Sequence, residues 1–195
     1  MSWTPKPSAT ETFSRRSEPY LTQSLRARLE RATLPRYATK RAALLPTLHA
    51  VQEEHGWLPP QAIEEIAAFL DLSPAETLDT ASFYEEYHLK PRGEHVIGVC
   101  RSVACEFCGS PAVTDACREA LGVEVGETTP DGKFTLLELE CLGSCGSAPA
   151  ALFDHDLHET VGPERLRAII EEARAGKRPV VESSTSDLAA GGGAH

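Results

Sequence analysis

Four cysteines stand in two pairs whose spacing suits a metal or cluster site. Four residues separate Cys100 from Cys105, three separate Cys141 from Cys145, and thirty-five lie between the two pairs. The strand-like runs HVIGV and FTLLELE lead directly into the first cysteine of each pair. Two strand ends that meet at one edge of a small sheet can bring four thiolates around a single point. Because thiolates are soft ligands, the sequence predicts either a zinc ion or an iron–sulfur cluster.

The composition is that of a water-soluble globular protein. The chain has 195 residues, of which 41% are hydrophobic and 25% charged, so it can form one or two domains with real cores. Its formal net charge of −10 argues against a nucleic-acid partner. No apolar run approaches the roughly 18 residues of a membrane helix, so no direct membrane insertion is expected. The N-terminus lacks the apolar core of a secretory signal, and the six cysteines therefore predict a reducing compartment.

The chain divides into four segments by pattern. Residues 1–18 are rich in Ser, Thr and Pro and are predicted to be disordered, as are residues 177–195, which are rich in Ser, Ala and Gly. Residues 19–90 have helical periodicity and predict a compact helical domain. Residues 91–176 alternate between strand and helix patterns and predict an α/β domain. The fold class is therefore α+β, with an N-terminal helical bundle.

Local signals place the helices of the first domain. A weak first helix is predicted by three leucines spaced four residues apart, Leu21, Leu25 and Leu29. A second helix ends at Gly56, and Pro46 either kinks it or lies in its first turn. Pro60 begins a third helix. Ser73, followed by Pro74 and then Glu76, is a helix N-cap with a capping-box spacing and begins a fourth.

The second domain has the element order β-α-β-β-β-α. The predicted elements are a strand over 95–99, a helix from Ser110-Pro111 to Gly122, a strand over 134–139, a hairpin of 150–153 and 157–161 around residues 154–156, and a helix from Pro163 to Gly176. This order is that of a thioredoxin-like unit.

Longer motifs of the chain resemble a known family. They are CRSVAC, ECLGSCGSAPA and TPDGKF around the cysteines, and LLPTLHAVQEEHGWLP, AIEEIAAFL and ASFYEEYHLKPRGEH upstream. Together they are similar to the thioredoxin-like [2Fe-2S] subunit of NADH:quinone oxidoreductase, the E-chain of bacterial respiratory complex I. The resemblance covers about residues 36–178. The same architecture occurs in NAD-linked hydrogenases and formate dehydrogenases.

The resemblance implies a cofactor, a site and partners. The family's four cluster ligands fall on Cys100, Cys105, Cys141 and Cys145, so a [2Fe-2S] cluster is expected. FMN and NADH are expected on a partner, the F-chain of the same complex, and this subunit would accept one electron at a time from the flavin. Other subunits of the peripheral arm are further expected partners, and the location is cytoplasmic, on the cytoplasmic face of the inner membrane through the complex. The chain would thus be part of an oxidoreductase without a complete active site.

Two features of the residues agree with a site for electron transfer rather than for catalysis. The nucleotide fingerprints GxGxxG and GxxxxGK[ST] are both absent from the sequence, and no side chain is assigned a catalytic role. A cluster with four thiolates carries a net charge of −2 and needs N–H donors around its sulfurs. Gly143 and Gly146 bracket Cys145 and allow the backbone to approach closely. Three serines near the ligands are expected to bond to their own turns before the sulfurs, namely Ser102, Ser144 and Ser147.

The other chemically interesting side chains have simpler interpretations. Cys117 lies on the apolar face of a helix and is interpreted as a small core residue. Cys108 departs from the family pattern, and it could replace Cys105 in a wrongly assembled cluster. His155 and His158 flank a turn and are expected at the surface, and no histidine is assigned as a ligand. Aromatic residues of the helical domain are expected in a core or an interface, namely Trp57, Phe83, Tyr84 and Tyr87.

Three other functions compete with the subunit hypothesis. A free-standing thioredoxin-like ferredoxin would not need the helical domain, and co-purification with a flavoprotein distinguishes the two. A zinc-stabilised interaction module would be colourless, whereas an iron–sulfur protein is red-brown. A disulfide oxidoreductase that uses Cys105 and Cys108 would compete with the cluster for Cys105.

Overall fold

The computed structural model describes residues 15–181, which fall into two compact units that divide between Pro91 and Arg92. The segments predicted to be disordered lie mostly outside the described residues, and their described parts, 15–18 and 177–181, contain no helix or strand. Each unit has a hydrophobic core of its own. Among residues 15–181 there is no helix with the length and apolar character needed to cross a membrane.

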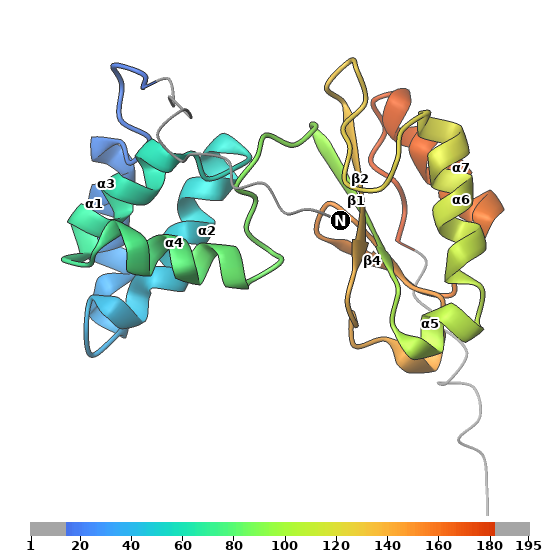
Figure 1. Cartoon of the computed structure of the whole chain (residues 1–195), viewed down its shortest axis with the longest axis horizontal. Coiled ribbons are helices and arrows are strands. Elements are labelled where there is room, and N and C mark those ends of the chain that lie inside the picture. Colours follow the sequence, from blue (N-terminus) through green and yellow to red (C-terminus); the bar gives the residue numbers. More distant parts are fainter. Residues whose placement is uncertain (1–14, 182–195) are drawn as a thin grey trace, which may run out of the picture. The chain divides into compact units, whose positions relative to one another are not determined.

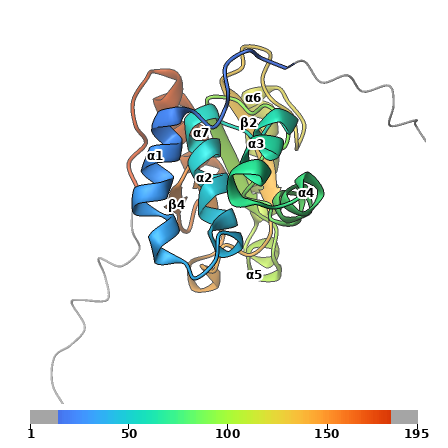
Figure 2. The same cartoon turned by 90° about the vertical axis from the view of Figure 1, so that its left-hand side faces the viewer.

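The first unit is helical (Figure 1). Its elements are α1 (Gln23–Ala32), the 3-10 turns η2 (Leu34–Arg36) and η3 (Arg41–Ala43), α2 (Leu44–His55), α3 (Pro60–Leu70) and α4 (Pro74–Phe83). Figure 2 shows α1 and α2 side by side, and α3 packs against both α2 and α4. The predicted helical bundle is therefore confirmed.

The ends of these helices follow the local signals of the sequence. Gly56 ends α2 with a φ of 77°, a left-handed conformation that suits glycine. Pro46 lies in the first turn of α2, where its missing N–H is harmless. Pro60 begins α3. The Ser73 side chain accepts a hydrogen bond from the Glu76 N–H at the start of α4, as the cap predicts.

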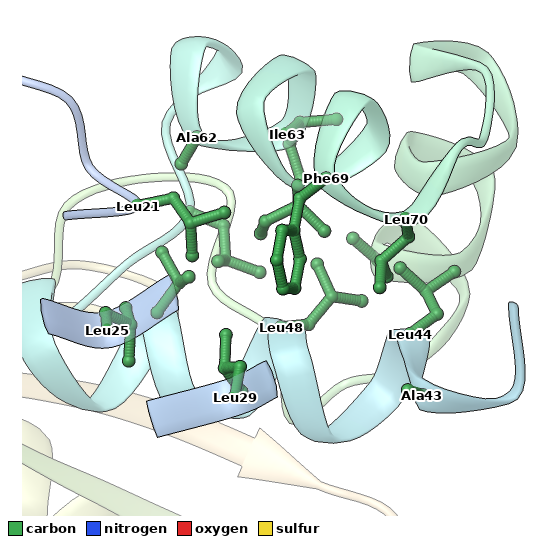
Figure 3. Close-up of a cluster of buried hydrophobic side chains, with 14 of the residues drawn as sticks. Leu21, Leu25, Leu29, Ala43, Leu44, Leu48, Ala62, Ile63, Phe69 and Leu70 are labelled. Carbon is green, nitrogen blue, oxygen red and sulfur yellow. The ribbon is translucent and has the colours of Figure 1, made fainter. Parts of the chain in front are cut away.

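Leucine and isoleucine side chains form the core of this unit (Figure 3). Leu25 and Leu29 of α1 pack with Leu48 of α2 and Phe69 and Leu70 of α3. Tyr87 closes one side and donates its hydroxyl to the Leu45 carbonyl oxygen over 2.9 Å. Burial of this apolar surface is the main force that holds the helices together.

Two of the four aromatic residues singled out from the sequence are exposed rather than packed. Phe83, the last residue of α4, is 79% exposed, and Tyr84 is 44% exposed. Tyr87 is buried and Trp57 is half-buried. These residues were expected in a core or an interface, and only Tyr87 lies in the core.

The second unit is a four-stranded mixed sheet with helices. Its elements are β1 (His95–Cys100), α5 (Val103–Phe107), α6 (Ser110–Leu121), β2 (Phe134–Leu139), the 3-10 turn η4 (Cys145–Ser147), β3 (Ala151–Phe153), β4 (Asp156–His158) and α7 (Pro163–Arg174). The strand order is β2-β1-β3-β4, with β1 parallel to β2 and the other pairs antiparallel. Helices α6 and α7 lie side by side on one face of the sheet (Figure 1). The predicted order β-α-β-β-β-α is found with one addition, the short helix α5 between β1 and α6.

The hairpin of β3 and β4 differs from its predicted form. Asp154 adopts a positive φ of 53°, and its carboxylate accepts the Val96 N–H over 2.8 Å. The same carboxylate lies 2.9 Å from His95 Nδ1. The turn is therefore shorter than predicted, and β4 begins at Asp156 and ends at His158 instead of spanning 157–161.

The shorter turn also corrects the prediction for His158. This residue pairs with Ala151 across the two strands, and directly opposed residues share a face of the sheet. Because Ala151 is fully buried, His158 is buried too, with 3% of its surface exposed. His155, in the turn itself, is exposed as predicted.

Candidate metal centre

The pairing of β1 with β2 brings the first cysteine of each pair together. Cys100 is the last residue of β1 and lies opposite Leu139, the last residue of β2. The pairing continues one step further, because the Arg101 N–H donates to the Leu139 carbonyl oxygen over 2.9 Å. Side chains alternate between the faces of a strand, so Cys141, two residues after Leu139, belongs to the face of Cys100. Parallel strand ends thus deliver two sulfurs to one edge.

Two short turns deliver the second cysteine of each pair. Cys105 lies in α5, the five-residue helix that follows β1, and Cys145 is the first residue of η4. Figure 1 shows α5 at one end of the sheet. The Cys105 thiol lies close enough to both Cys100 and Cys145 for their charges to interact. Cys141 Sγ and Cys145 Sγ are 3.6 Å apart. All four sulfurs are therefore neighbours.

The two pairs differ in exposure. Cys100 and Cys105 are each 2% exposed and pack against the buried Ala150. Cys141 and Cys145 are exposed. The site thus has a buried side and an open side, which lets it exclude part of the solvent while remaining close to the surface.

Hydrogen-bond donors point at the sulfurs, as a negatively charged group requires. The Gly143 N–H donates to Cys141 Sγ over 3.4 Å. The Ala150 backbone N–H lies near the Cys105 thiol and favours its thiolate. The Ser102 side chain forms no cap bond to the helix that it precedes, and its hydroxyl lies near enough to Cys141 to favour the thiolate of that residue. For Ser102 the expectation that the turn would take its hydroxyl is therefore wrong. The Ser144 hydroxyl donates to Glu159 instead of to a sulfur.

The same contacts shift the acidity of the thiols in opposite directions. The Gly143 N–H, followed by the bonds from Cys145 and Ser102, lowers the pKa of Cys141. Burial raises the pKa of Cys105, and the neighbouring Cys100 raises it further. The hydrogen bond to Cys141 raises the pKa of Cys145. Of these three free thiols, Cys141 is therefore the one whose negative charge is stabilised by its contacts.

A charged pair ties the two ligand-bearing loops together next to the sulfurs. Arg101 follows Cys100, Glu140 precedes Cys141, and the Arg101 guanidinium binds the Glu140 carboxylate through Nε at 3.0 Å and through a second nitrogen. Both side chains are about half exposed, so water screens the pair and it adds at most about 1 kcal/mol to stability. Its effect is to hold residues 101 and 140 in register.

The remaining two cysteines lie outside this group. Cys117 is fully buried in the core between the sheet and α6, and burial raises the pKa of its thiol to about 12. It is a core residue, as predicted. Cys108 is exposed at the end of α5, where its N–H donates to the carbonyl oxygens of Ala104 and Cys105.

The four neighbouring cysteine sulfurs form a donor set that suits a two-iron group. A [2Fe-2S] cluster takes two thiolates on each iron, and the chain offers two pairs of adjacent sulfurs with N–H and O–H donors beside them.

Comparisons with known proteins agree with this chemistry. The family described as thioredoxin-like [2Fe-2S] ferredoxin matches residues 31–174. NADH-quinone oxidoreductase subunit 2 of Thermus thermophilus is 42% identical over 140 residues, which cover 71% of this chain and 77% of that protein. A second relative, from Rhizobium meliloti and likewise named as an NADH-quinone oxidoreductase subunit, is 40% identical over 147 residues, which cover 75% of this chain and 88% of that protein.

A solved structure shares the fold at lower identity. It is the NAD+-reducing [NiFe]-hydrogenase in the air-oxidized state, with a TM-score of 0.60 and 28% identity. The match covers 68% of this chain and 23% of the hydrogenase chain. The architecture of this chain thus also occurs as one part of a longer polypeptide.

Proposed function

Because the chain belongs to the thioredoxin-like [2Fe-2S] ferredoxin family, we propose that it is the iron–sulfur electron-transfer subunit of an NADH:quinone oxidoreductase. The observation that carries the proposal is the grouping of four cysteine sulfurs at the ends of β1 and β2 in a chain with this family match. The relatives named as NADH-quinone oxidoreductase subunits are about 40% identical over most of both chains.

The ligands of the cluster are the two pairs of neighbouring sulfurs. Cys100 and Cys105 would hold one iron on the buried side, and Cys141 and Cys145 the other on the open side. When bound, the cluster takes up and releases one electron. The Gly143 and Ala150 N–H groups stabilise negative charge on the sulfurs.

The electron donor is FMN on a partner chain, the F-chain of the same complex, which also binds NADH. The open side at Cys141 and Cys145 gives the donor access to the site. Beside Cys105, α5 presents Val103 and Phe107 to solvent, 71% and 89% exposed. An exposed phenylalanine of this kind is a typical anchor of a protein interface, and we assign the exposed face of α5 to the contact with the F-chain.

The two units would have different tasks. The unit that follows Pro91 carries all six cysteines and holds the cluster, and the helical unit supplies a further docking surface around Phe83 and Tyr84. Through other subunits of the peripheral arm, the protein would sit on the cytoplasmic face of the inner membrane.

The equivalent subunit of an NAD-linked hydrogenase is the second candidate. The 0.60 TM-score to the NAD+-reducing hydrogenase supports it. The higher identity to the NADH-quinone oxidoreductase subunits favours the first candidate.

Anaerobic purification of the tagged chain from its own cells tests both candidates. Red-brown colour, two irons per chain, co-purifying flavoprotein and NADH-dependent quinone reduction support the proposal. Hydrogen-dependent reduction of NAD+ by the same preparation would support the hydrogenase candidate instead. One zinc per chain, without visible absorbance, would overturn both.

A further inference from the structure

We propose that the ion pair between Arg101 and Glu140 sets the reduction potential of the cluster through two opposing charges. The Arg101 charge raises the potential, and the Glu140 charge lowers it. This inference rests on the proposed function, because it assigns the pair a role toward the cluster of that same site. Neither residue is assigned a catalytic role, since both act on the cluster from positions beside its ligands.

The pairing of β1 with β2 places one charge beside a ligand on each strand. Cys100, the last residue of β1, lies opposite Leu139, the last residue of β2. The Arg101 N–H extends the pairing by donating to the Leu139 carbonyl oxygen over 2.9 Å. Arg101 directly follows the ligand Cys100, and Glu140 directly precedes the ligand Cys141. Each charge is therefore joined to a ligand by a single peptide unit, which spans about 3.8 Å between Cα atoms.

The two side chains are in close contact. Arg101 Nε lies 3.0 Å from Glu140 Oε1, and a second guanidinium nitrogen binds the same oxygen. A guanidinium remains protonated in proteins, and carboxylates are ionised at neutral pH. The pair thus carries a full positive and a full negative charge whose sum is zero.

The cluster responds to these charges because its own charge changes. Uptake of one electron adds one negative charge to the cluster and its ligands. A nearby positive charge stabilises this reduced form more than the oxidised form and raises the potential, whereas a negative charge lowers it. The side chains of Arg101 and Glu140 are 55% and 58% exposed, so water weakens both effects. A unit charge at about 10 Å changes the ratio of reduced to oxidised cluster about two-fold if water lies between.

The test is an anaerobic redox titration of the full-length chain, with the reduced cluster followed by electron paramagnetic resonance. It is done at an ionic strength of about 0.01 M, where the Debye length is about 30 Å. Arg101→Gln removes the positive charge and should lower the ratio of reduced to oxidised cluster about two-fold at a fixed ambient potential. Glu140→Gln removes the negative charge and should raise this ratio about two-fold. The two variants then differ about four-fold, or about 36 mV, because a ten-fold ratio is 59 mV for one electron.

The signs of the shifts separate the charges from a structural role. Each Gln variant breaks the same ion pair, so a loosened site would be common to both, whereas the effects of charge are opposite. Arg101→Lys keeps the positive charge without the planar fork and should titrate like the unaltered chain. The difference between the two Gln variants should also disappear at about 1 M salt, where the Debye length is about 3 Å.

A second exposed ion pair of the same unit provides the matched control. Arg167 of α7 and Glu119 of α6 are 2.8 Å apart, and neither adjoins a proposed ligand in sequence. Arg167→Gln and Glu119→Gln change the net charge of the chain by the same amounts as the two test variants. Their smaller shifts would show that the effect depends on nearness to the ligands and not on total charge.

Other outcomes would overturn the inference. They are shifts in the same direction, an unchanged potential in both Gln variants, or an Arg101→Lys variant that titrates like Arg101→Gln. Loss of the cluster from both Gln variants would also overturn it, because the pair would then act on assembly and not on the potential. All these results leave the proposed function intact, provided that the unaltered chain binds a two-iron cluster. The absence of a two-iron cluster from the unaltered chain would overturn the proposed function, and this inference with it.

Discussion

Replacement of Gly98 by alanine should destabilise the cysteine-bearing unit through one specific clash. Gly98 lies in the middle of β1, and a Cβ at this position would come within 2.8 Å of Leu139 Cγ and nearer still to its Cδ1. Leu139 must therefore move, although it lies opposite Cys100 and two residues before Cys141. Overpacking of this kind costs about 1–3 kcal/mol. A loss of stability of this size raises the population of molecules whose cysteine-bearing unit is unfolded by a factor of about 5–150.

The assay must report on the correct unit. Both tryptophans and all four tyrosines precede Arg92, so intrinsic fluorescence follows the helical unit only. Cys117 is fully buried in the other core, and its alkylation, measured by mass spectrometry, requires that core to open. In the metal-free chain, Gly98→Ala should accelerate alkylation of Cys117 by about 5–150-fold. The fluorescence melting curve of the helical unit should not change.

Two further variants identify the clash as the cause. Gly146→Ala adds a methyl group to the same unit at a position with no atom within 4 Å, and it should leave the alkylation of Cys117 unchanged. Leu139→Ala removes the side chain that Gly98→Ala would strike, so the double variant should be more stable than the sum of the single effects by about 0.5–3 kcal/mol. Additive effects in the double variant, or an unchanged rate in Gly98→Ala, would refute the reasoning.

Three other predictions concern the cluster, the partner and pH. Replacement by alanine of any one proposed ligand should abolish the bound iron and the visible absorbance, the ligands being Cys100, Cys105, Cys141 and Cys145. The control variant Cys117→Ala should retain both. A ligand variant that still binds a full complement of iron would show that the replaced cysteine is not a ligand. Phe107→Ser should weaken binding to the flavoprotein at least ten-fold in a titration, with unchanged iron content, because about 1.4 kcal/mol is a typical loss at an interface anchor; equal affinity would place the contact elsewhere. Burial, helped by Tyr84 and Glu86, raises the pKa of Tyr87 to about 12 from its usual 10. Because the pKa of Tyr87 is higher in the folded chain, its neutral hydroxyl stabilises the fold fully below pH 10, and this contribution is lost between pH 10 and 12. The stability of the helical unit, measured by fluorescence, should therefore fall over this pH range. In Tyr87→Phe the fall should be smaller.

Those parts of the fold that depend on local chemistry could be predicted from the sequence. Gly56, Pro60 and Ser73 mark helix ends by their own backbone preferences, and the structure has helix ends at all three. The strand over 134–139 was also predictable, because an apolar run bounded by turn residues needs no information from elsewhere in the chain.

The features that escaped prediction depend on pairing between distant segments or on short elements. Helix α5 has five residues, too few for a helical period to be visible. The burial of His158 follows from the length of the turn at Asp154, which in turn depends on the Val96 N–H, 58 residues away in sequence. The nearness of the Ser102 hydroxyl to Cys141 likewise depends on strand pairing, and nothing in the local sequence distinguishes Ser102 from a serine that caps its own helix.

The ligand set therefore depends on the register of β1 with β2 as much as on the spacing of the cysteines. Side chains alternate along a strand, so a slip of one residue would move Cys141 to the opposite face from Cys100 and separate the two pairs. Three contacts oppose such a slip. Gly98 leaves room for the Leu139 side chain, the Arg101 N–H binds the Leu139 carbonyl oxygen, and the Arg101 side chain binds Glu140. These contacts all lie within three residues of Cys100 or Cys141, where an error in register would be most harmful to the site.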